Sequence, residues 1–373
     1  MRYIVVDMVT KIGFKNYKLF KQYNELEIKP ITILFGKNSS GKSSITKFLY
    51  VFLETFEGTE KEMEYMHFAL EQNEVEIGAE FRDLVYGRRP TGTFELFLDY
   101  HEYNYDNKYN IIFGNSDQRG FKPIVLSQSH EITRFYGQDT FYLGPIRSEA
   151  KRDYRPVSNM KYLYNHPKGD DGYDRLIYEA LDKESFFLEN LNNWFKTVFD
   201  GWSIRVNSDR EPYQLELSKD EISINLVDTG QGICQFIPIA VHCFTETEKN
   251  TLSIIEQPEL HLHPAAHGDI AELFVNSALK DKNKRFVIET HSQNLILRIR
   301  KLIAEGTISH NDVSLNFVDF DEEQTISTIK KINIDHLGKV DFWPPGIFEE
   351  SYHEAVELRR AQKEREENNE VHH

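Results

Sequence analysis

The loop at residues 36–43 has the residue types and spacing of a phosphate-binding site. Its sequence, GKNSSGKS, fits the G-x-x-x-x-G-K-[ST] pattern without deviation. The two glycines let the backbone curl so that successive N–H groups point inward at phosphate oxygens. Lys42 is expected to reach the β- and γ-phosphates, and the Ser43 hydroxyl to hold Mg²⁺. The residues predicted to contact the bound phosphates are Gly36, Asn38, Ser39, Ser40, Gly41, Lys42, Ser43 and Ser44.

The stretch TLSIIEQPELHLHP at 251–264 admits two kinds of metal chemistry. It begins as a buried strand and places Glu256 at the carboxyl end, where ligands gather in open α/β sheets. Glu256 is therefore predicted to complete the Mg²⁺ site begun by Ser43. A zinc site at His261 and His263 is the alternative, but a helix would spread these side chains by about 200°. No cysteine or further acid nearby completes a tetrahedral set, and a purely structural role for the histidines also stays open.

Strand and helix patterns place both segments in an α/β fold. An apolar run at 30–35 predicts a buried strand before the loop, and the spacing over 43–56 predicts a helix after it. Beyond residue 228 strands and helices alternate again, which favours a mainly parallel core sheet. The elements expected there are a helix at 231–245, a strand at 251–256, a helix at 265–279, a strand at 285–289, a helix at 292–304, and a hairpin of 313–320 with 325–332.

The middle of the chain has a different pattern. Alternation of period two over 93–127, with a turn at 106–108, predicts antiparallel strands. A helix is expected at 60–72, and one long helix or two over 173–200. Further strands are expected at 202–206, 213–218 and 221–227. The predicted organisation is a head at 1–340 that carries an inserted β-rich and helical lobe at 57–227, followed by a tail with a charged helix at 341–373.

Composition narrows the class of protein. The chain has 373 residues and a net charge of −16, which argues against indiscriminate binding of nucleic acid. Cys234 and Cys243 are predicted to be buried thiols in a reducing compartment. The longest apolar stretch, 233–244, is shorter than the roughly 20 residues that span a bilayer, so no membrane partner and a cytoplasmic location are expected. The basic clusters, each predicted to be a solvated surface face, lie at 87–90, 147–155 and 280–285.

Three further segments complete an ordered set of motifs. VDTGQGICQFIPI (227–239) puts a glycine-rich turn at a helix start, ETHSQNLI (289–296) places His291 at a strand end, and YLGPIRSE lies at 142–149. With the phosphate loop and IEQPELHLHP, they resemble the head of an ABC-type ATPase, and most closely the RecF, SMC and OLD-like family in its stand-alone OLD-like branch. The resemblance covers most of residues 1–305. It implies an α/β P-loop NTPase of the ABC-ATPase head type, with a mainly parallel core sheet, an antiparallel β lobe and a helical subdomain.

The same resemblance implies a site shared between two copies of the chain. ATP with Mg²⁺ is the implied cofactor, bound by the phosphate loop of one subunit in a head-to-head homodimer. His291 is the implied switch histidine at the γ-phosphate, and 259–264 the D-loop at the dimer seam. The signature loop that reaches across to the γ-phosphate would consist of Asp228, Thr229, Gly230 and Gly232. The Q-loop residue stays open among Gln118, Gln128 and Gln138.

The chain departs from the ABC pattern at Gln257, where those ATPases place the glutamate that polarises the attacking water. A glutamine carbonyl is too weakly basic to accept the proton. It can orient a water, as in P-loop GTPases, which turn over slowly unaided. Glu259 is expected to supply the missing charge if the backbone is extended there. We therefore predict slow or partner-controlled hydrolysis, with the catalytic residues Lys42, Gln257, Glu259 and His291.

By resemblance, the nucleotide state is expected to control an effector such as a nuclease, in antiphage defence or DNA repair. The acids at 317–323 are predicted to form a hairpin tip and not the metal-dependent nuclease centre of OLD nucleases. Contact with DNA or RNA is expected through Arg147, Lys151 and Arg152. Two alternatives remain. One is a scaffold that closes on ATP without hydrolysing it, and the other is a P-loop kinase, which leaves the signature loop and His291 unexplained.

Overall fold

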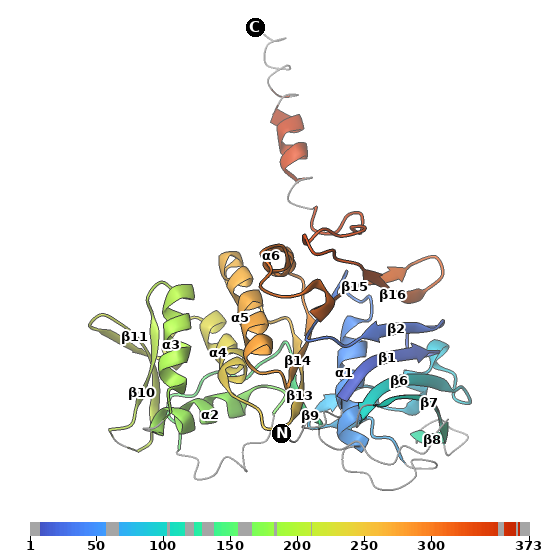
Figure 1. The fold of residues 1–373 in the computed structure, drawn as a ribbon, viewed down its shortest axis with the longest axis horizontal. Coiled ribbons are helices and arrows are strands. Elements are labelled where there is room, and N and C mark those ends of the chain that lie inside the picture. The colour runs from blue at the N-terminus through green and yellow to red at the C-terminus, as the bar shows by residue number, and fades with distance from the viewer. Residues whose placement is uncertain are drawn as a thin grey trace.

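A six-stranded sheet forms the centre of the molecule in the computed structural model (Figure 1). All neighbouring strands are parallel except the edge pair β15 and β16. In spatial order the strands are β16 (Ile326–Ile332), β15 (Val313–Asp321), β3 (Ile31–Phe35), β14 (Lys284–Glu289), β13 (Asn250–Glu256) and β9 (Gln138–Leu143). The structure describes residues 8–56, 67–102, 105–115, 123–128, 138–155, 166–182, 185–209, 211–349, 354–362 and 365.

Helices cover both faces of this sheet. Strands β3 and β13 are buried along their whole length, because continuous apolar runs suit a sheet that is covered on two sides. Successive residues point to opposite cores, so that Ile33 and Ile255 belong to one and Leu34 and Ile254 to the other. The helices are α1 (Lys42–Phe56) on one face and α4 (Gln231–Phe244), α5 (His267–Lys280) and α6 (Gln293–Ala304) on the other.

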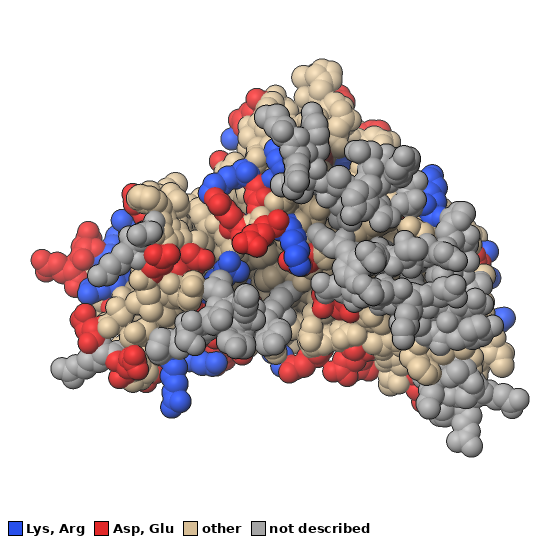
Figure 2. All heavy atoms as spheres, turned by 60° about the horizontal axis from the view of Figure 1, so that its bottom comes forward, with Lys and Arg blue, Asp and Glu red and all other residues tan. Residues whose placement is uncertain are grey.

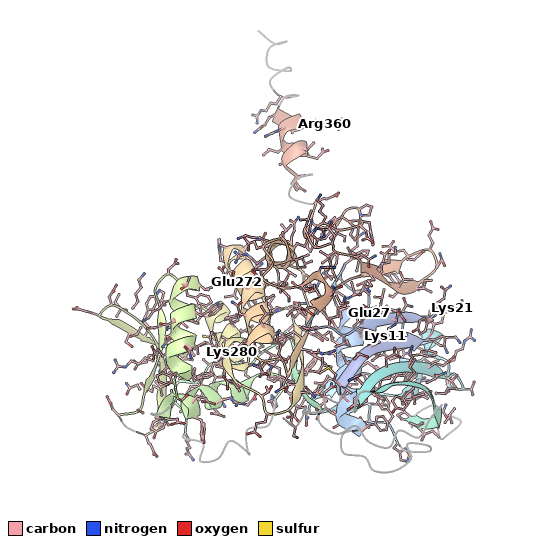
Figure 3. The ribbon with its side chains drawn as sticks, in the orientation of Figure 1. Lys11, Lys21, Glu27, Glu272, Lys280 and Arg360 are labelled. Atoms are coloured by element: carbon pink, nitrogen blue, oxygen red, sulfur yellow. The ribbon has the colours of Figure 1, made fainter. Side chains whose placement is uncertain are left out.

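A five-stranded antiparallel sheet packs against the outer side of α1 (Figure 1). Aromatic residues fill the interface: Phe94 stacks on Phe113 at 4.6 Å between ring centroids, and Phe48 of α1 meets Phe94 edge-on at 5.7 Å. In spatial order the strands are β2 (Asn24–Glu27), β1 (Met8–Lys15), β6 (Phe94–Glu102), β7 (Tyr105–Asn115) and β8 (Pro123–Gln128). Lys11 of β1 and Glu27 of β2 lie on this lobe (Figure 3).

A helical subdomain lies at the other end of the molecule (Figure 1). Two helices occupy the region for which one or two were predicted, and a small antiparallel sheet follows them. These elements are α2 (Asp170–Leu181), α3 (Phe187–Val198), β10 (Ser203–Asn207), β11 (Gln214–Lys219) and β12 (Ile222–Asn225). Short 3₁₀ turns lie at Phe81–Leu84 (η1), Tyr86–Arg88 (η2), Leu226–Asp228 (η4), Pro264–Ala266 (η5) and His310–Asp312 (η6).

Two local predictions in the middle of the chain were wrong. Of the helix expected at 60–72, residues 67–72 are not helical, and β4 (Glu71–Gln72) instead pairs with β5 (Val75–Glu76). Residues 57–66 lie outside the described part of the chain. The turn expected at 106–108 lies within β7, because these residues continue the pairing with β6. The span 57–227 contributes to three larger sheets, since β6 to β8 join β1, β9 joins the core and β10 to β12 form their own sheet.

The segment 341–349 packs on the core, although the tail was predicted to begin at 341. The Trp343 ring stacks on Phe35 with 5.4 Å between centroids, and Phe35 is the last residue of β3 before the phosphate loop. The helix at 354–362 is exposed along its length and points away from the body, as Figure 3 shows for Arg360. None of the helices in the described ranges has the length and apolar character needed to cross a membrane.

Candidate functional site

The phosphate loop connects β3 to α1 under tight steric limits. Gly36 has a φ of +154°, and a Cβ there would lie 2.2 Å from the carbonyl oxygen of Val318 on β15. Gly41 has a φ of +102°, a conformation that L-residues rarely adopt. Both glycines of the motif are therefore required by the backbone path that carries the chain into α1.

Lys42 lies inside this loop. Its ammonium donates to the carbonyl oxygens of Gly36 at 3.1 Å and Lys37 at 2.8 Å. Burial lowers the pKa of Lys42, and the carboxylates of Glu289 and Glu256 oppose that effect. Because charged acceptors form stronger hydrogen bonds than neutral carbonyls, a phosphate group would compete successfully for this ammonium.

A cavity of about 320 Å³ lies against the loop and unites residues from four parts of the chain. The predicted residues Gln257 and His291 face the same cavity as Lys42 and Ser43, and Glu289 joins them. Gly36 and Ser40 do not line the cavity, and Ser40 is fully buried. The lining residues are Leu19, Asn38, Ser39, Gly41, Lys42, Ser43, Ser44, Gln257, Glu289 and His291.

Two buried carboxylates lie next to each other at this cavity. Glu256 and Glu289 end the neighbouring strands β13 and β14 and are partners in the parallel register. The Ser43 hydroxyl donates to Glu289 at 2.9 Å, whereas Glu256 accepts from Thr46 Oγ1 at 2.5 Å and from the Tyr142 hydroxyl at 2.9 Å. Burial raises the pKa of both acids, and together with the neighbouring Glu256 charge it raises the pKa of Glu289 to about 7.

Gln257 follows Glu256 in a left-handed conformation, with a φ of +47°. Its backbone N–H donates to the Glu289 carbonyl oxygen at 2.7 Å. From the other side, Arg147 Nη2 donates to the carbonyl oxygens of Glu256 at 2.7 Å and Gln257 at 3.0 Å. These backbone contacts hold the Gln257 side chain at the cavity wall without engaging its amide.

The prediction that Arg147, Lys151 and Arg152 contact nucleic acid is corrected for Arg147. Arg147 is only 4% exposed because it lies beneath the loop after β13. Arg152 forms an ion pair with Asp228, with nitrogen–oxygen distances of 2.6 and 3.0 Å. Lys151 is exposed. On the face shown in Figure 2, basic and acidic side chains are intermingled.

Glu259 does not replace the missing acid at Gln257. The backbone turns after Gln257 and is not extended, because the Leu260 N–H donates to the Gln257 carbonyl. The Glu259 carboxylate is buried and accepts from Thr290 Oγ1 at 2.8 Å and from the His291 N–H at 2.7 Å. Glu259 therefore positions the backbone at His291, and it is not among the residues that line the cavity.

The predicted signature loop forms the start of α4. Asp228 is held by Arg152, and Thr229 Oγ1 donates to the Leu226 carbonyl at 2.7 Å. At Gly232 a Cβ would lie 2.3 Å from the His261 carbonyl oxygen, whereas at Gly230 it would have no neighbour within 4 Å. None of the four predicted residues (Asp228, Thr229, Gly230 and Gly232) lines the phosphate-loop cavity, and Thr229 instead lines a second cavity of about 250 Å³.

Residues 31–298 match a protein-family model described as "AAA domain, putative AbiEii toxin, Type IV TA system". The chain belongs to this AAA family. Residues 308–358, which include β15, β16 and the segment packed on Phe35, match a family of unknown function, DUF3696. None of the curated proteins matches this AAA domain.

Solved structures of SMC heads are similar to this AAA domain. An SMC head bound to the C-winged helix domain of ScpA has a TM-score of 0.51 at 13% identity, over 87% of this chain and 98% of that chain. The SMC head domain from Thermotoga maritima has a TM-score of 0.47 at 13% identity, over 87% and 99%. A Pyrococcus furiosus head with an extended coiled coil, bound to the C-terminal domain of ScpA, has 0.48 at 11% identity, over 95% and 100%. The fold class predicted for the AAA domain, a P-loop NTPase of the ABC-ATPase head type, is confirmed.

The histidines considered as zinc ligands have separate roles in the AAA domain. His263 Nδ1 accepts from the Ala265 N–H at 3.2 Å and caps the turn η5. His261 has a φ of +66° and packs its carbonyl against Gly232. Within the described ranges, no group of three or more His, Cys, Asp or Glu residues is placed to hold a metal ion.

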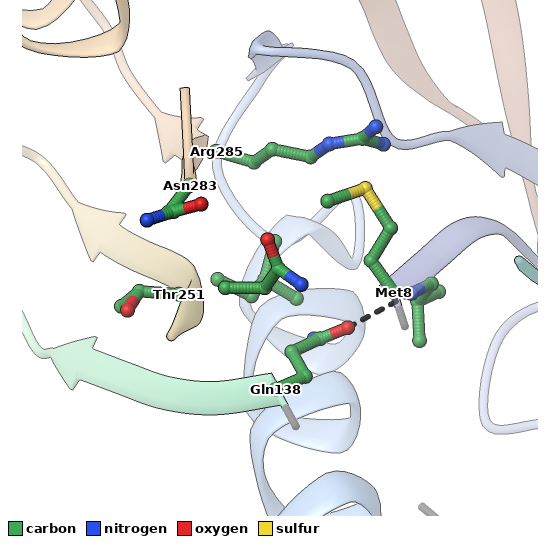
Figure 4. Close-up of a pocket in the computed structure, with 8 residues that line it drawn as sticks. Met8, Gln138, Thr251, Asn283 and Arg285 are labelled. Carbon is green, nitrogen blue, oxygen red and sulfur yellow. Dashed lines mark hydrogen bonds between the residues drawn. The ribbon is translucent and has the colours of Figure 1, made fainter. Parts of the chain in front are cut away.

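Gln138 lies far from the phosphate loop, at the amino-terminal end of β9. Its Oε1 accepts from the Val9 N–H at 2.8 Å, beside Met8, Thr251 and Asn283 (Figure 4). Gln118 and the side chain of Gln128, the other Q-loop candidates, lie outside the described residues. Glu289 and Arg147 are the site residues that the motifs did not assign to the phosphate site. The signal for Glu289 was its place at a strand end, two residues before His291.

Proposed function

We propose that this protein is a slow ATPase whose head binds Mg²⁺–ATP in the 36–44 loop. The observation that carries the proposal is one cavity shared by Lys42, Ser43, Gln257 and His291, with buried carboxylates beside it. We infer ATP and not GTP as the nucleotide from the family resemblance. In this proposed arrangement Lys42 holds the β- and γ-phosphates, and His291 contacts the γ-phosphate.

Mg²⁺ fits the residues at this site. A serine hydroxyl and carboxylate oxygens are the hard ligands that Mg²⁺ prefers, and the ion usually adds phosphate oxygens and waters to one or two carboxylates. The Ser43 hydroxyl and one of the two acids at the ends of β13 and β14, Glu256 or Glu289, would hold it. A bound Mg²⁺ ion would supply positive charge against the negative charge of the phosphates.

Gln257 supports slow turnover. Its amide faces the cavity and can orient a water, but it cannot take the proton from that water. Glu259 is bound to Thr290 and His291, so it does not provide the base either. Unaided hydrolysis on the order of 10⁻³ s⁻¹ is expected, as for P-loop GTPases with an orienting glutamine.

Two heads are proposed to form each complete site. The signature loop lines a different cavity from the phosphate loop of its own chain, which is the arrangement expected if it serves a second copy. Two-fold symmetry would then create two equal sites per dimer. The open surroundings of Gly230 leave room for a phosphate from the partner.

Nucleotide-dependent closure of the heads is proposed to control a partner effector, such as a nuclease, in antiphage defence or DNA repair. The family description refers to AbiEii toxins of type IV toxin–antitoxin systems, and two of the similar SMC heads were solved with ScpA domains. A separate effector is favoured because Asp319 on the β15–β16 hairpin is bound to Lys330 at 2.6 Å. Asp321 likewise accepts from the Gln324 N–H at 2.9 Å within the hairpin.

The proposal is tested by phosphate release from Mg²⁺–ATP in a single turnover. We expect slow release by the wild-type protein and none by Lys42→Ala, because that variant loses the cation on the phosphates. Release that persists in Lys42→Ala would contradict the proposed site. Tight ATP binding without release would favour the alternative function, a scaffold that closes on ATP without hydrolysing it.

A further inference from the structure

We propose that Glu289, and not Glu256, is the carboxylate that binds Mg²⁺ beside Ser43. The inference rests on the proposed function and specifies its metal site. The motifs assigned this role to Glu256 at the end of β13. The side-chain contacts favour the opposite assignment, because Glu289 faces the phosphate loop while Glu256 faces the body of α1.

The position of Glu289 suits a metal ligand. It ends β14, which lies between the phosphate-loop strand β3 and β13. Both of its carboxylate oxygens accept from the Ser43 hydroxyl, at 2.9 and 3.1 Å. The side chain also lines the cavity together with Lys42. Because this carboxylate already accepts from the serine hydroxyl at the cavity wall, it can bind an ion there without a shift of the strand.

The contacts of Glu256 suit a structural acid. It is 1% exposed and is not among the residues that line the cavity. One of its oxygens accepts two hydrogen bonds, from Thr46 on α1 and from Tyr142 on β9. Glu256 therefore ties α1 to the sheet, and reaching an ion at Ser43 would cost it these charge-assisted bonds.

The charges around the pair favour a divalent cation there. Two carboxylates that end adjacent parallel strands repel each other in a buried environment. Lys42 is the cation next to Glu289, and a bound triphosphate would attract it. The described residues hold no group of three or more metal-binding side chains. The ion is therefore expected to enter with the nucleotide, whose phosphates complete its ligands.

The test uses Mn²⁺ as the probe and a non-hydrolysable ATP analogue. Binding of Mn²⁺ in the presence of the analogue is measured by electron paramagnetic resonance, and analogue affinity is measured with Mg²⁺ and with EDTA. For Glu289→Gln we expect Mn²⁺ affinity to fall by about tenfold or more, with analogue binding in EDTA unchanged or tighter. For the matched control Glu256→Gln we expect a smaller loss of Mn²⁺ affinity and a lower melting temperature.

Glu289→Asp supplies a second variant that keeps the charge but retracts the carboxylate, and it is expected to weaken Mn²⁺ binding as well. The assignment is overturned if Glu256→Gln abolishes Mn²⁺ binding while Glu289→Gln keeps it, or if Glu289→Gln binds Mn²⁺ like the wild type. A wild-type protein that binds no analogue with or without metal would overturn the proposed function, and this assignment with it.

Discussion

At the scale of single residues, the site differs from its sequence prediction in how it distributes acidic groups. Glu256 was expected to hold Mg²⁺, Gln257 to orient the attacking water, and Glu259 to compensate for the glutamine. The structure binds Glu259 to the backbone of His291 and brings Glu289 to Ser43. The Ser43–Glu289 contact joins residues 246 positions apart, so no local pattern could reveal it. The phosphate loop, in contrast, is a local motif, and its place between a strand and a helix was predicted correctly.

The prediction at this scale concerns Gln257. Changing Gln257→Glu should raise the rate of the chemical step by at least about tenfold, because a carboxylate can accept the proton that an amide cannot. The backbone contacts from Arg147 do not depend on the side chain, so the loop should keep its position. Single-turnover phosphate release is the measurement, with Gln257→Leu as the control that loses the orienting amide. A Glu variant no faster than the wild type would show that proton transfer does not limit the reaction.

At the scale of elements, those with a local apolar pattern were predicted, and those fixed by contacts distant in sequence were not. Strands β13 and β14 and helices α4, α5 and α6 lie within two residues of their predicted bounds, because each carries its own apolar pattern. Strand β1 was missed because its eight residues are fixed by pairing with β6, about 85 positions away. In the same way, the pairing of β6 with β7 overrides the turn signal at 106–108. The segment 341–349 was assigned to a tail because its contact with Phe35 is also long-range.

The prediction for an element concerns the segment 144–155, in which Arg147 and Arg152 have different tasks. Arg147→Ala should lower the free energy of unfolding by about 1–3 kcal/mol, since the buried Glu256 carbonyl loses this donor and the Gln257 carbonyl keeps only the Leu260 N–H. The matched control Arg152→Ala removes an exposed ion pair with Asp228 and should lower the free energy of unfolding much less than Arg147→Ala does. Urea denaturation measures both. Equal losses would mean that Arg147 does not support the loop after β13.

At the scale of the whole molecule, the proposed mechanism requires that two heads share each site. The core sheet places the phosphate loop, Gln257 and His291 at one cavity, while the signature loop at the start of α4 lines another. Order and spacing of the motifs were enough to predict the fold, because the parallel strands bring their carboxyl ends to one edge. The proposed dimer consists of two chains, so its test requires two different variants of the chain.

The most direct test mixes two inactive variants. Lys42→Ala removes the phosphate contact, and Gly230→Val alters the signature loop at a position with a φ of −66° and no neighbour within 4 Å, so the monomer should fold normally. If two heads share each site, an equal mixture forms mixed dimers with one intact site, and ATP hydrolysis should recover to about a quarter of the wild-type rate. A mixture as inactive as its components, despite dimer formation, would contradict the shared site.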